Sequence, residues 1–267
     1  MRDLAQDKLA ARRAAAARFA DDRVWALGEN AWTRIRVAAL VDLLPKGAGS
    51  LLDVGCGDGQ FAHAARAVLG APGLVVGIDR GRPGLERFRH VGHPAVADGD
   101  ALPFASRSFD LVVCSEVLEH LPAPVLAGAA RELARVARRE LVISVPDRED
   151  LTRELIRCPE CEHRFQAWGH LHSFDLPAID RLFPDFARTA ARTAGPRRRY
   201  HPRLVALRQS LGRYAYEPTA VCPQCGNSRF PDRRRDPVTF ACDALNTVAR
   251  PFKEDYWLLA RYRRRET

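Results

Sequence analysis

The middle of the chain alternates between short apolar runs and segments in which apolar residues recur at helical spacing. The helical spacing predicts helices over 59–69, 83–89 and 123–139. Two of the apolar runs, LVVGI (74–78) and LVVC (111–114), lack a polar residue at every second position, so we expect these strands to be buried on both faces. The pattern predicts an α/β fold with a doubly wound parallel sheet. The strands are expected at Ser50–Val54, Leu74–Ile78, Pro94–Ala97, Leu111–Cys114 and Glu140–Val145.

The segments on either side of this core interrupt the alternation. Helical spacing also covers 7–20 and 30–44, and a helix over 176–182, a strand over 186–194 and a closing strand over 256–263 follow the core. Two irregular stretches lie between these elements, the first rich in Pro, Cys and His and the second rich in Arg. The expected units are an N-terminal helical cap (1–47), the core (48–145), a first insertion (146–174), a core helix and strand (175–194), a second insertion (195–251) and the closing strand (252–267).

Composition narrows the class of protein. The chain has 267 residues, of which 46% are hydrophobic and 28% charged, so we expect one or two globular domains and no disordered or fibrous structure. No apolar run approaches the ~18 residues that a transmembrane helix needs. The first 22 residues contain four aspartates and no apolar centre, unlike a signal peptide. The sequence therefore predicts a cytoplasmic protein with no membrane span.

The formal net charge of +9 is concentrated in the last third of the chain. Residues 191–267 contain 16 arginines and one lysine against seven acidic residues, whereas the first 190 residues are close to neutral. The runs of three arginines at 197–199, 233–235 and 263–265 could form a face for phosphate groups. The alternative is a solvated surface in a chain that uses 39 arginines and only three lysines.

A glycine-rich turn follows the first predicted strand. Gly55, Gly57 and Gly59 alternate directly after this strand, and Asp53 lies two residues before the first of them. Glycine lets a ligand approach the backbone closely, because it has no Cβ and adopts positive φ without strain. The acid at the strand end would repel a pyrophosphate, but it could hold the ammonium of an amino-acid-like ligand. Taken alone, the turn could also be an ordinary tight turn.

The next three predicted strands also end in polar groups. Asp79 ends the second strand, where a carboxylate can accept hydrogen bonds from a ribose diol. Asp98 and Gly99 follow the third strand, and Ser115 and Glu116 follow the fourth. Ligands of open α/β sheets bind at the carboxyl ends of the strands. Four consecutive strand ends with polar groups predict one ligand site along this edge.

Residues 48–145, with these motifs in this order, resemble the core of class I S-adenosylmethionine-dependent methyltransferases of the small-molecule type. The resemblance implies a Rossmann-like, seven-stranded, mostly parallel sheet whose last strand is antiparallel. It also implies that S-adenosylmethionine is bound by the glycine turn, by the ribose-binding acid, by the adenine-binding segment and by the residues beside the methionine moiety. Residue by residue, the implied contacts are Asp53, Gly55, Cys56, Gly57, Gly59, Asp79, Arg80, Asp98, Gly99, Ser115 and Glu116.

Three histidines are candidates for the group that takes a proton from the methyl acceptor. His120 follows the fourth strand, near the expected position of the methyl group, and a neutral imidazole suits this task at pH 7. His170 and His172, in the first insertion, are the next candidates. Each of the three could instead have a structural role, with His120 capping the turn before Leu121.

Two Cys-Pro-x-Cys pairs lie in the two insertions. Cys158, Cys161, Cys222 and Cys225 can supply four thiolates to a tetrahedral structural zinc. Both insertions leave the carboxyl edge of the sheet, so the ion would tie two loops together as a lid over the active site. Scattered buried thiols, or a mixed site that includes His163, His170 or His172, are the alternatives.

The sequence therefore predicts a methyltransferase that acts on an oxygen or nitrogen of a small-molecule, sugar, glycan or lipid-linked acceptor. The basic last third is compatible with an anionic or phosphorylated acceptor. Two alternatives stay open: an RNA methyltransferase that grips nucleic acid with its Arg-rich third, and a non-catalytic zinc-bearing binding module. The sequence does not predict an oligomeric state.

Overall fold

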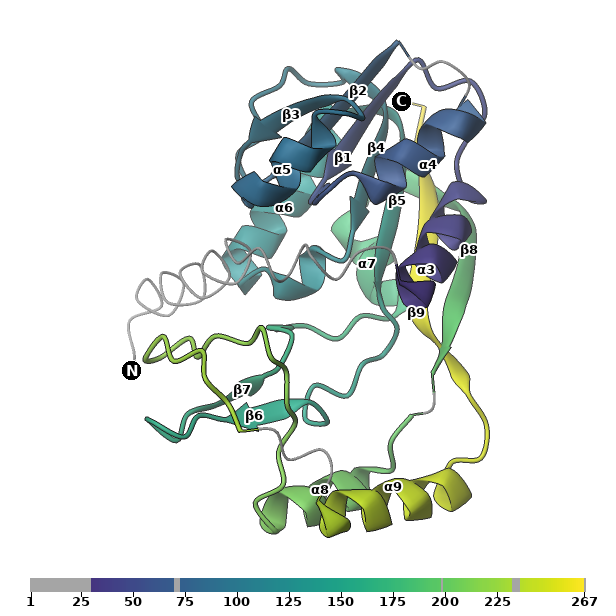
Figure 1. Cartoon of the computed structure of the whole chain (residues 1–267). Coiled ribbons are helices and arrows are strands. Elements are labelled where there is room, and N and C mark those ends of the chain that lie inside the picture. The colour runs from purple at the N-terminus through teal and green to yellow at the C-terminus, as the bar shows by residue number, and fades with distance from the viewer. Residues whose placement is uncertain (1–29, 70–72, 198, 232–235, 267) are drawn as a thin grey trace.

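A seven-stranded sheet forms the centre of the molecule (Figure 1). The computed structural model describes residues 30–69, 73–197, 199–231 and 236–266. The strand order is β3-β2-β1-β4-β5-β9-β8, and only β9 runs antiparallel to its neighbours. The predicted mostly parallel sheet with an antiparallel last strand is thus confirmed. The strands are β1 (Ser50–Val54), β2 (Leu74–Asp79), β3 (His93–Val96), β4 (Phe109–Ser115), β5 (Ala137–Pro146), β8 (Phe186–Arg197) and β9 (Glu254–Arg264).

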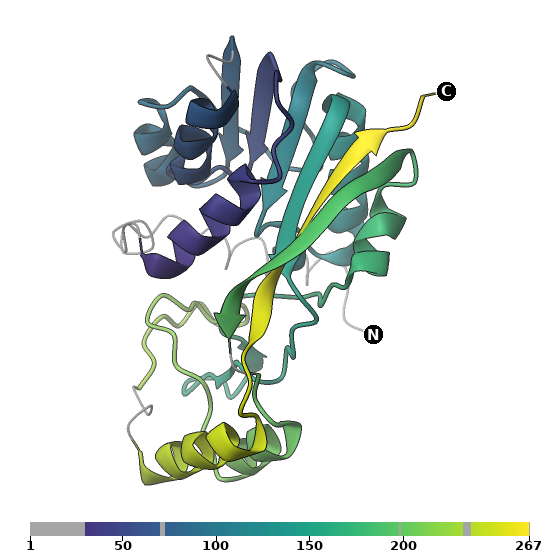
Figure 2. The same ribbon diagram turned by 90° about the vertical axis from the view of Figure 1, so that its right-hand side faces the viewer.

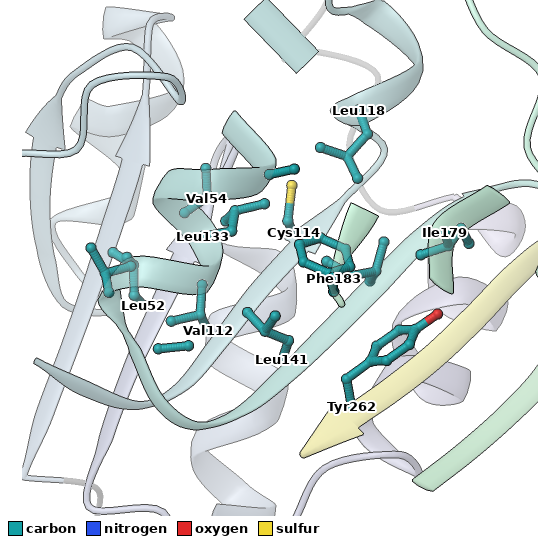
Figure 3. Packing of buried hydrophobic residues seen from close by; sticks show 14 of the residues in the cluster. Leu52, Val54, Val112, Cys114, Leu118, Leu133, Leu141, Ile179, Phe183 and Tyr262 are labelled. Carbon is teal, nitrogen blue, oxygen red and sulfur yellow. The ribbon is translucent and has the colours of Figure 1, made fainter. Parts of the chain in front are cut away.

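Helices cover both faces of the sheet because successive strand residues point to opposite sides. Leu52 belongs to the core on the side of α6 and α7, whereas its neighbour Leu51 belongs to the core on the side of α3, α4 and α5. Figure 3 shows the first of these cores, in which Leu133 of α6 and Phe183 approach the strands. The helices are α3 (Ala31–Val41), α4 (Gln60–Leu69), α5 (Arg82–Phe88), the 3-10 turn η1 (Leu118–His120), α6 (Ala123–Val136) and α7 (Leu176–Leu182).

The two insertions form a second layer beyond the carboxyl edge of the sheet. Strands β8 and β9 extend out of the sheet into this layer (Figure 2). The layer contains the hairpin of β6 (Leu155–Arg157) and β7 (Arg164–Gln166), and the helices α8 (Pro202–Ser210) and α9 (Pro237–Ala249). Its apolar centre under the hairpin is small and consists of Ile156, Ala167 and Ala220 with a few partly buried neighbours.

Several element bounds differ from the sequence prediction. Helix α6 ends at Val136, and β5 begins at Ala137 rather than at 140, because Ala137 pairs with Phe109. The second insertion, expected to be irregular, contains α8 and α9. Both helices begin with a proline. The residue before it, His201 for α8 and Asp236 for α9, accepts a hydrogen bond from a backbone N–H of the first turn through its side chain. The Asp-Pro pair at 236–237 is a sequence signal for the start of a helix, and a helix forms there although the Arg-rich composition around it had indicated an irregular segment.

The N-terminal cap is seen in part. Helix α3 falls within the predicted helix at 30–44 and packs against α4 and β8. The predicted helix at 7–20 lies outside the described residues, as does the middle arginine run at 233–235. Among the described residues, no helix is both long and apolar enough to cross a bilayer.

Candidate functional site

The glycine turn after β1 has the backbone that its sequence predicts. Gly55, Gly57 and Gly59 have φ angles of 77°, 52° and 88°, in the left-handed region that favours glycine. The N–H groups of Gly55 and Cys56 both donate to the carbonyl of Ile78 in β2, at 2.7 and 3.0 Å. The turn is therefore fixed to the neighbouring strand end, and its glycines line the carboxyl edge of the sheet.

Asp79 links the ends of the first two strands. Its Oδ2 accepts the Gly57 N–H at 3.0 Å, and its Oδ1 accepts the Gly81 N–H at 2.8 Å. Burial raises the pKa of the Asp79 carboxyl, and these backbone donors oppose the shift. The carboxylate thus has a fixed orientation beside the glycine turn, as a ribose-binding acid requires.

Asp53 is a buried carboxylate with an unused acceptor. It is 2% exposed, and its Oδ2 has no hydrogen-bond partner. Burial, reinforced by the negative charge of Asp79 and opposed by Arg36, raises the pKa of Asp53 to about 7. A buried polar atom without a partner is costly, so its presence beside a ligand edge indicates a ligand group that completes the bond. An ammonium group, such as S-adenosylmethionine would supply, can donate this hydrogen bond.

Arg36, on α3, is a site residue that sequence reasoning missed. Its Nη1 donates to Ser115 Oγ at 2.8 Å, and its guanidinium lies 5.9 Å from the centre of the Trp257 ring. Its charge lowers the pKa values of Asp53 and Glu116. The helical spacing of residues 30–44 predicted the helix but gave no signal that this arginine reaches the sheet edge.

Glu116 has both of its carboxylate oxygens occupied by protein donors. Ser144 Oγ donates to Oε1 at 3.1 Å, and Trp257 Nε1 donates to Oε2 at 2.8 Å. Its backbone has φ of 57°, a strained left-handed conformation for a residue with a side chain. Burial raises the pKa of Glu116, and Arg36 opposes the rise. The protein therefore holds this carboxylate firmly between β4, β5 and β9.

The adenine side of the predicted site is more open. Arg80 Nε pairs with Asp98 Oδ1 at 3.1 Å, and both side chains are about half exposed. The pair joins the ends of β2 and β3, with Gly99 following directly. Cys56 is a buried packing residue whose Sγ faces Gly77, where a Cβ would lie 2.7 Å from the sulfur.

Two of the three candidate histidines lie together. The rings of His120, on η1, and His170, in the first insertion, have centroids 4.7 Å apart at an angle of 71°. His170 Nδ1 is hydrogen-bonded to the Glu149 carboxylate, which also accepts from Tyr256 OH at 3.3 Å. Glu119, fully buried, has a ligand atom within 4.8 Å of both imidazoles. Burial, reinforced by the charge of Glu116, raises the pKa of the Glu119 carboxyl well above its ordinary value.

His172 is placed differently. Its Nε2 is hydrogen-bonded to the backbone carbonyl of Leu121 at 2.8 Å. The backbone N–H groups of Leu171 and His172 donate to the carbonyl of Glu119, at 2.7 and 3.3 Å. The first insertion is thereby attached to η1, next to the carboxyl end of β4.

The four cysteines of the two pairs meet, although about 60 residues separate the pairs. Cys158 Sγ lies 3.5 Å from Cys225 Sγ, and Cys161 Sγ lies 3.6 Å from Cys222 Sγ. Zinc–sulfur bonds of about 2.3 Å in a tetrahedron place the sulfurs about 3.8 Å apart. All four sulfurs lie within 4.8 Å of one another, so their positions fit one tetrahedral ion after small shifts.

The two cysteine turns share one backbone pattern. In each, the first cysteine's N–H donates to the carbonyl five residues later, and its carbonyl accepts the N–H four residues later. The fourth residue after it has positive φ in both turns: 60° at Glu162 and 76° at Gly226. Glutamate thus adopts at 162 the conformation for which glycine is usual, and an ion pair with Arg157 holds its side chain.

The core of the chain matches a known family model. Residues 52–145 match a model described as a methyltransferase domain. A methyltransferase of Mycobacterium marinum, named as uncharacterized, is 41% identical over 92 residues, which are 33% of this chain and 35% of the relative. The chain thus spans about a third of the length of the first curated relatives it matches. These matches show that residues 52–145 are similar to methyltransferase domains.

Other relatives extend this picture. The ubiquinone biosynthesis O-methyltransferase of Thiobacillus denitrificans is 35% identical over 33% of this chain and 40% of its own length. The demethylmenaquinone methyltransferase of Staphylococcus haemolyticus is 31% identical over 55% of this chain and 60% of its own length. The structure of the N-methyltransferase NodS of Bradyrhizobium japonicum with S-adenosylhomocysteine has a TM-score of 0.56 at 17% identity, covering 98% of this chain and 100% of that one. This last similarity shows the fold alone.

Proposed function

We propose that the chain transfers a methyl group from S-adenosylmethionine to an oxygen or nitrogen of a small acceptor. The buried, unpartnered Oδ2 of Asp53, beside three left-handed glycines, is the observation that carries this proposal. Asp53 would hold the cofactor's ammonium, Asp79 its ribose, and the Arg80–Asp98 pair would border its adenine. When bound, the cofactor supplies an electrophilic methyl group on a cationic sulfur.

The protein's own part in the reaction is to orient the acceptor, exclude water and take a proton. His120 and His170 are the proposed proton acceptors, because their rings lie in contact at the end of η1. Glu149 accepts the hydrogen bond at His170 Nδ1, so it fixes that ring and would stabilise a positive charge on it. His172 has its Nε2 engaged by the Leu121 carbonyl, which favours a structural role.

We propose a structural zinc ion bound by Cys158, Cys161, Cys222 and Cys225. The sulfur separations and the matched backbone turns support one tetrahedral site. The small apolar centre beneath the hairpin offers little burial of its own, so an ion worth roughly 10 kcal/mol would dominate the stability of this layer. Four thiolates leave no open position on the metal, so the ion would order the loops above the sheet edge and take no part in methyl transfer.

For the acceptor, we propose a small molecule with a hydroxyl or amine group. The relatives named as ubiquinone and demethylmenaquinone methyltransferases support a small-molecule acceptor, and the first of them, named as an O-methyltransferase, supports a hydroxyl group. A phosphorylated or lipid-linked acceptor stays within the proposal. The RNA alternative is not favoured, because most of the described arginines in the runs at 197–199 and 263–265 direct their guanidinium groups to the protein's own acceptors. These are Arg197, Arg199, Arg263 and Arg264.

The decisive experiment is a calorimetric titration with S-adenosylhomocysteine. We expect Asp79→Asn to weaken binding at least tenfold, because it removes the charge and alters the acceptors at the ribose position. Asp42→Asn is the matched control: this carboxylate is 63% exposed, pairs with Arg192 on the surface and lies away from the glycine turn. Equal affinities of the two variants, or the absence of any binding by wild type, would contradict the proposal.

A further inference from the structure

Glu119 is a buried group that the proposed cofactor site does not use. Its side chain is 0% exposed, and neither Oε1 nor Oε2 has a hydrogen-bond partner. Two buried oxygens without hydrogen-bond partners carry a desolvation cost that a bound partner would remove. Such a carboxylate requires a partner, and the partner must be small enough to fit a closed site.

Two imidazoles face this carboxylate. One ligand atom each from Glu119, His120 and His170 lie within 4.8 Å of one another. The histidines come from different parts of the chain: His120 ends η1 and His170 belongs to the first insertion. The contact is fixed by the backbone, since the carbonyl of Glu119 accepts the N–H of Leu171. The fold therefore brings one carboxylate and two imidazoles together at one point.

His170 also has the outer contact that metal-binding histidines require. Its Nδ1 is hydrogen-bonded to Glu149, a carboxylate that is 6% exposed and also accepts from Tyr256. A histidine that binds a metal with one nitrogen nearly always donates its other N–H to a carboxylate or carbonyl. The bond to Glu149 thus selects Nε2 as the nitrogen left to bind an ion, and it holds the ring in place.

We propose that Glu119, His120 and His170 form a binding site for a divalent transition-metal ion, with zinc as the reference ion, separate from the four cysteines. Imidazole nitrogen and carboxylate oxygen suit such ions. Bonds of about 2.1 Å place tetrahedral ligands roughly 3.4 Å apart, whereas these three ligand atoms lie within 4.8 Å of one another, so binding needs closures of at most about 1.4 Å.

Three protein ligands leave at least one coordination position open. This is the pattern of a reactive metal site and differs from the closed set of four cysteines. The ligands end η1 and enter from the first insertion, beside Ser115 and Glu116 at the end of β4. With an ion bound, His120 and His170 would serve as its ligands and no longer as proton acceptors. The ion could then bind the oxygen of a hydroxyl acceptor and lower its pKa, so that the acceptor loses its proton to solvent more easily. The binding site itself is independent of whether methyl transfer occurs.

The test measures zinc in the full-length protein without cofactor or acceptor. After dialysis against zinc and removal of free ion, elemental analysis should find one equivalent fewer in Glu119→Gln and in His170→Asn than in wild type. His172→Asn is the matched control, because this histidine lies two residues from His170 but its Nε2 bonds the Leu121 carbonyl. It should retain the wild-type zinc content.

Glu149→Gln tests the outer contact. We expect the zinc dissociation constant at this site to rise 10- to 100-fold, as for other lost outer-shell carboxylates. Thermal unfolding of each variant confirms that the fold is kept; Glu119→Gln is isosteric and removes only a buried charge. A zinc content in folded Glu119→Gln equal to that of wild type would overturn the proposal. A wild-type protein that binds zinc at this site but not S-adenosylhomocysteine would instead count against the proposed function alone.

Discussion

The unpartnered carboxylate of Asp53 makes cofactor binding depend on pH. With a pKa of about 7 in the free protein, about a tenth of Asp53 is ionised at pH 6 and about nine-tenths at pH 8. The ammonium of S-adenosylhomocysteine is attracted by the ionised form. Affinity should therefore rise as the pH rises through 7, by roughly tenfold between pH 6 and pH 8, or about 1.4 kcal/mol. By linkage, the bound ligand lowers the pKa of Asp53.

Calorimetry at pH 6, 7 and 8 measures this dependence directly. The neutral amide of Asp53→Asn cannot titrate, so its binding should be weaker at pH 8 and nearly independent of pH. The exposed Asp42→Asn control should keep the wild-type slope. A wild-type affinity that is equal at pH 6 and pH 8, or a slope that persists in Asp53→Asn, would refute the role given to this carboxylate.

Arg36 affects the pH at which Asp53 ionises and cofactor binding strengthens. Its charge lowers the pKa of Asp53, so Arg36→Met should raise this pKa and move the binding midpoint to higher pH. Arg34→Met removes an exposed arginine from the same helix and should leave the midpoint unchanged. The same titrations distinguish the two variants, and an unshifted midpoint in Arg36→Met would show that the arginine does not act on this site.

Two further predictions concern the glycine turn and the cysteines. Gly55→Ala should cost about 2–5 kcal/mol in urea unfolding, because the new Cβ would lie 2.1 Å from Val117 Cγ2 and φ is 77°. Gly47→Ala has a similar φ but open space around it and should cost only about 1–2 kcal/mol; equal costs would rule out the clash. Cys222→Ser should lose one zinc in elemental analysis, whereas Cys242→Ser, a buried cysteine outside the pairs, should lose none; equal zinc would dispose of the four-thiolate site.

The sheet and the glycine turn could be predicted because their signals are local. A run such as LVVGI is buried on both faces wherever it lies in the sheet, and Gly55, Gly57 and Gly59 need their left-handed backbone whatever surrounds them. The helices α8 and α9 were missed because charged composition was given more weight than the proline at the start of each.

The buried contacts around the site could not be predicted in the same way. Arg36, Glu149 and Trp257 lie outside the core motifs in sequence, and their side chains reach the site only through the packing of α3, the first insertion and β9. No spacing rule connects residue 36 with residue 115. Glu119 lies inside a motif that sequence analysis used, yet its neighbour His120 was selected because histidine titrates near neutral pH. Burial, which distinguishes Glu119, is a property of the fold.

The fold also shows what many arginines of the basic last third contact. Among the residues of this third that the structure describes, five arginines pair with acidic residues from the first 190 residues, so these charges attach β8 and β9 to the rest of the protein. These pairs are Arg192–Asp42, Arg197–Glu154, Arg199–Asp147, Arg261–Glu140 and Arg263–Glu140. An arginine paired in this way must leave its carboxylate partner before it can bind a phosphate.

Salt dependence tests this interpretation. If the protein bound an RNA backbone through several phosphates, its affinity for RNA would fall steeply as the salt concentration rises. The slope of log affinity against log salt concentration would be near −0.7 for each phosphate neutralised on a single strand. A small acceptor presents at most one or two phosphates to the protein, so its Michaelis constant should change only a few-fold between 50 and 200 mM salt. Over the same range, nucleic-acid binders with many phosphate contacts lose about 10³-fold or more in affinity. Methylation assays with the small acceptor and with RNA, each at both salt concentrations, separate the two. Salt-sensitive methylation of RNA would mean that ligand contacts replace these arginine pairs.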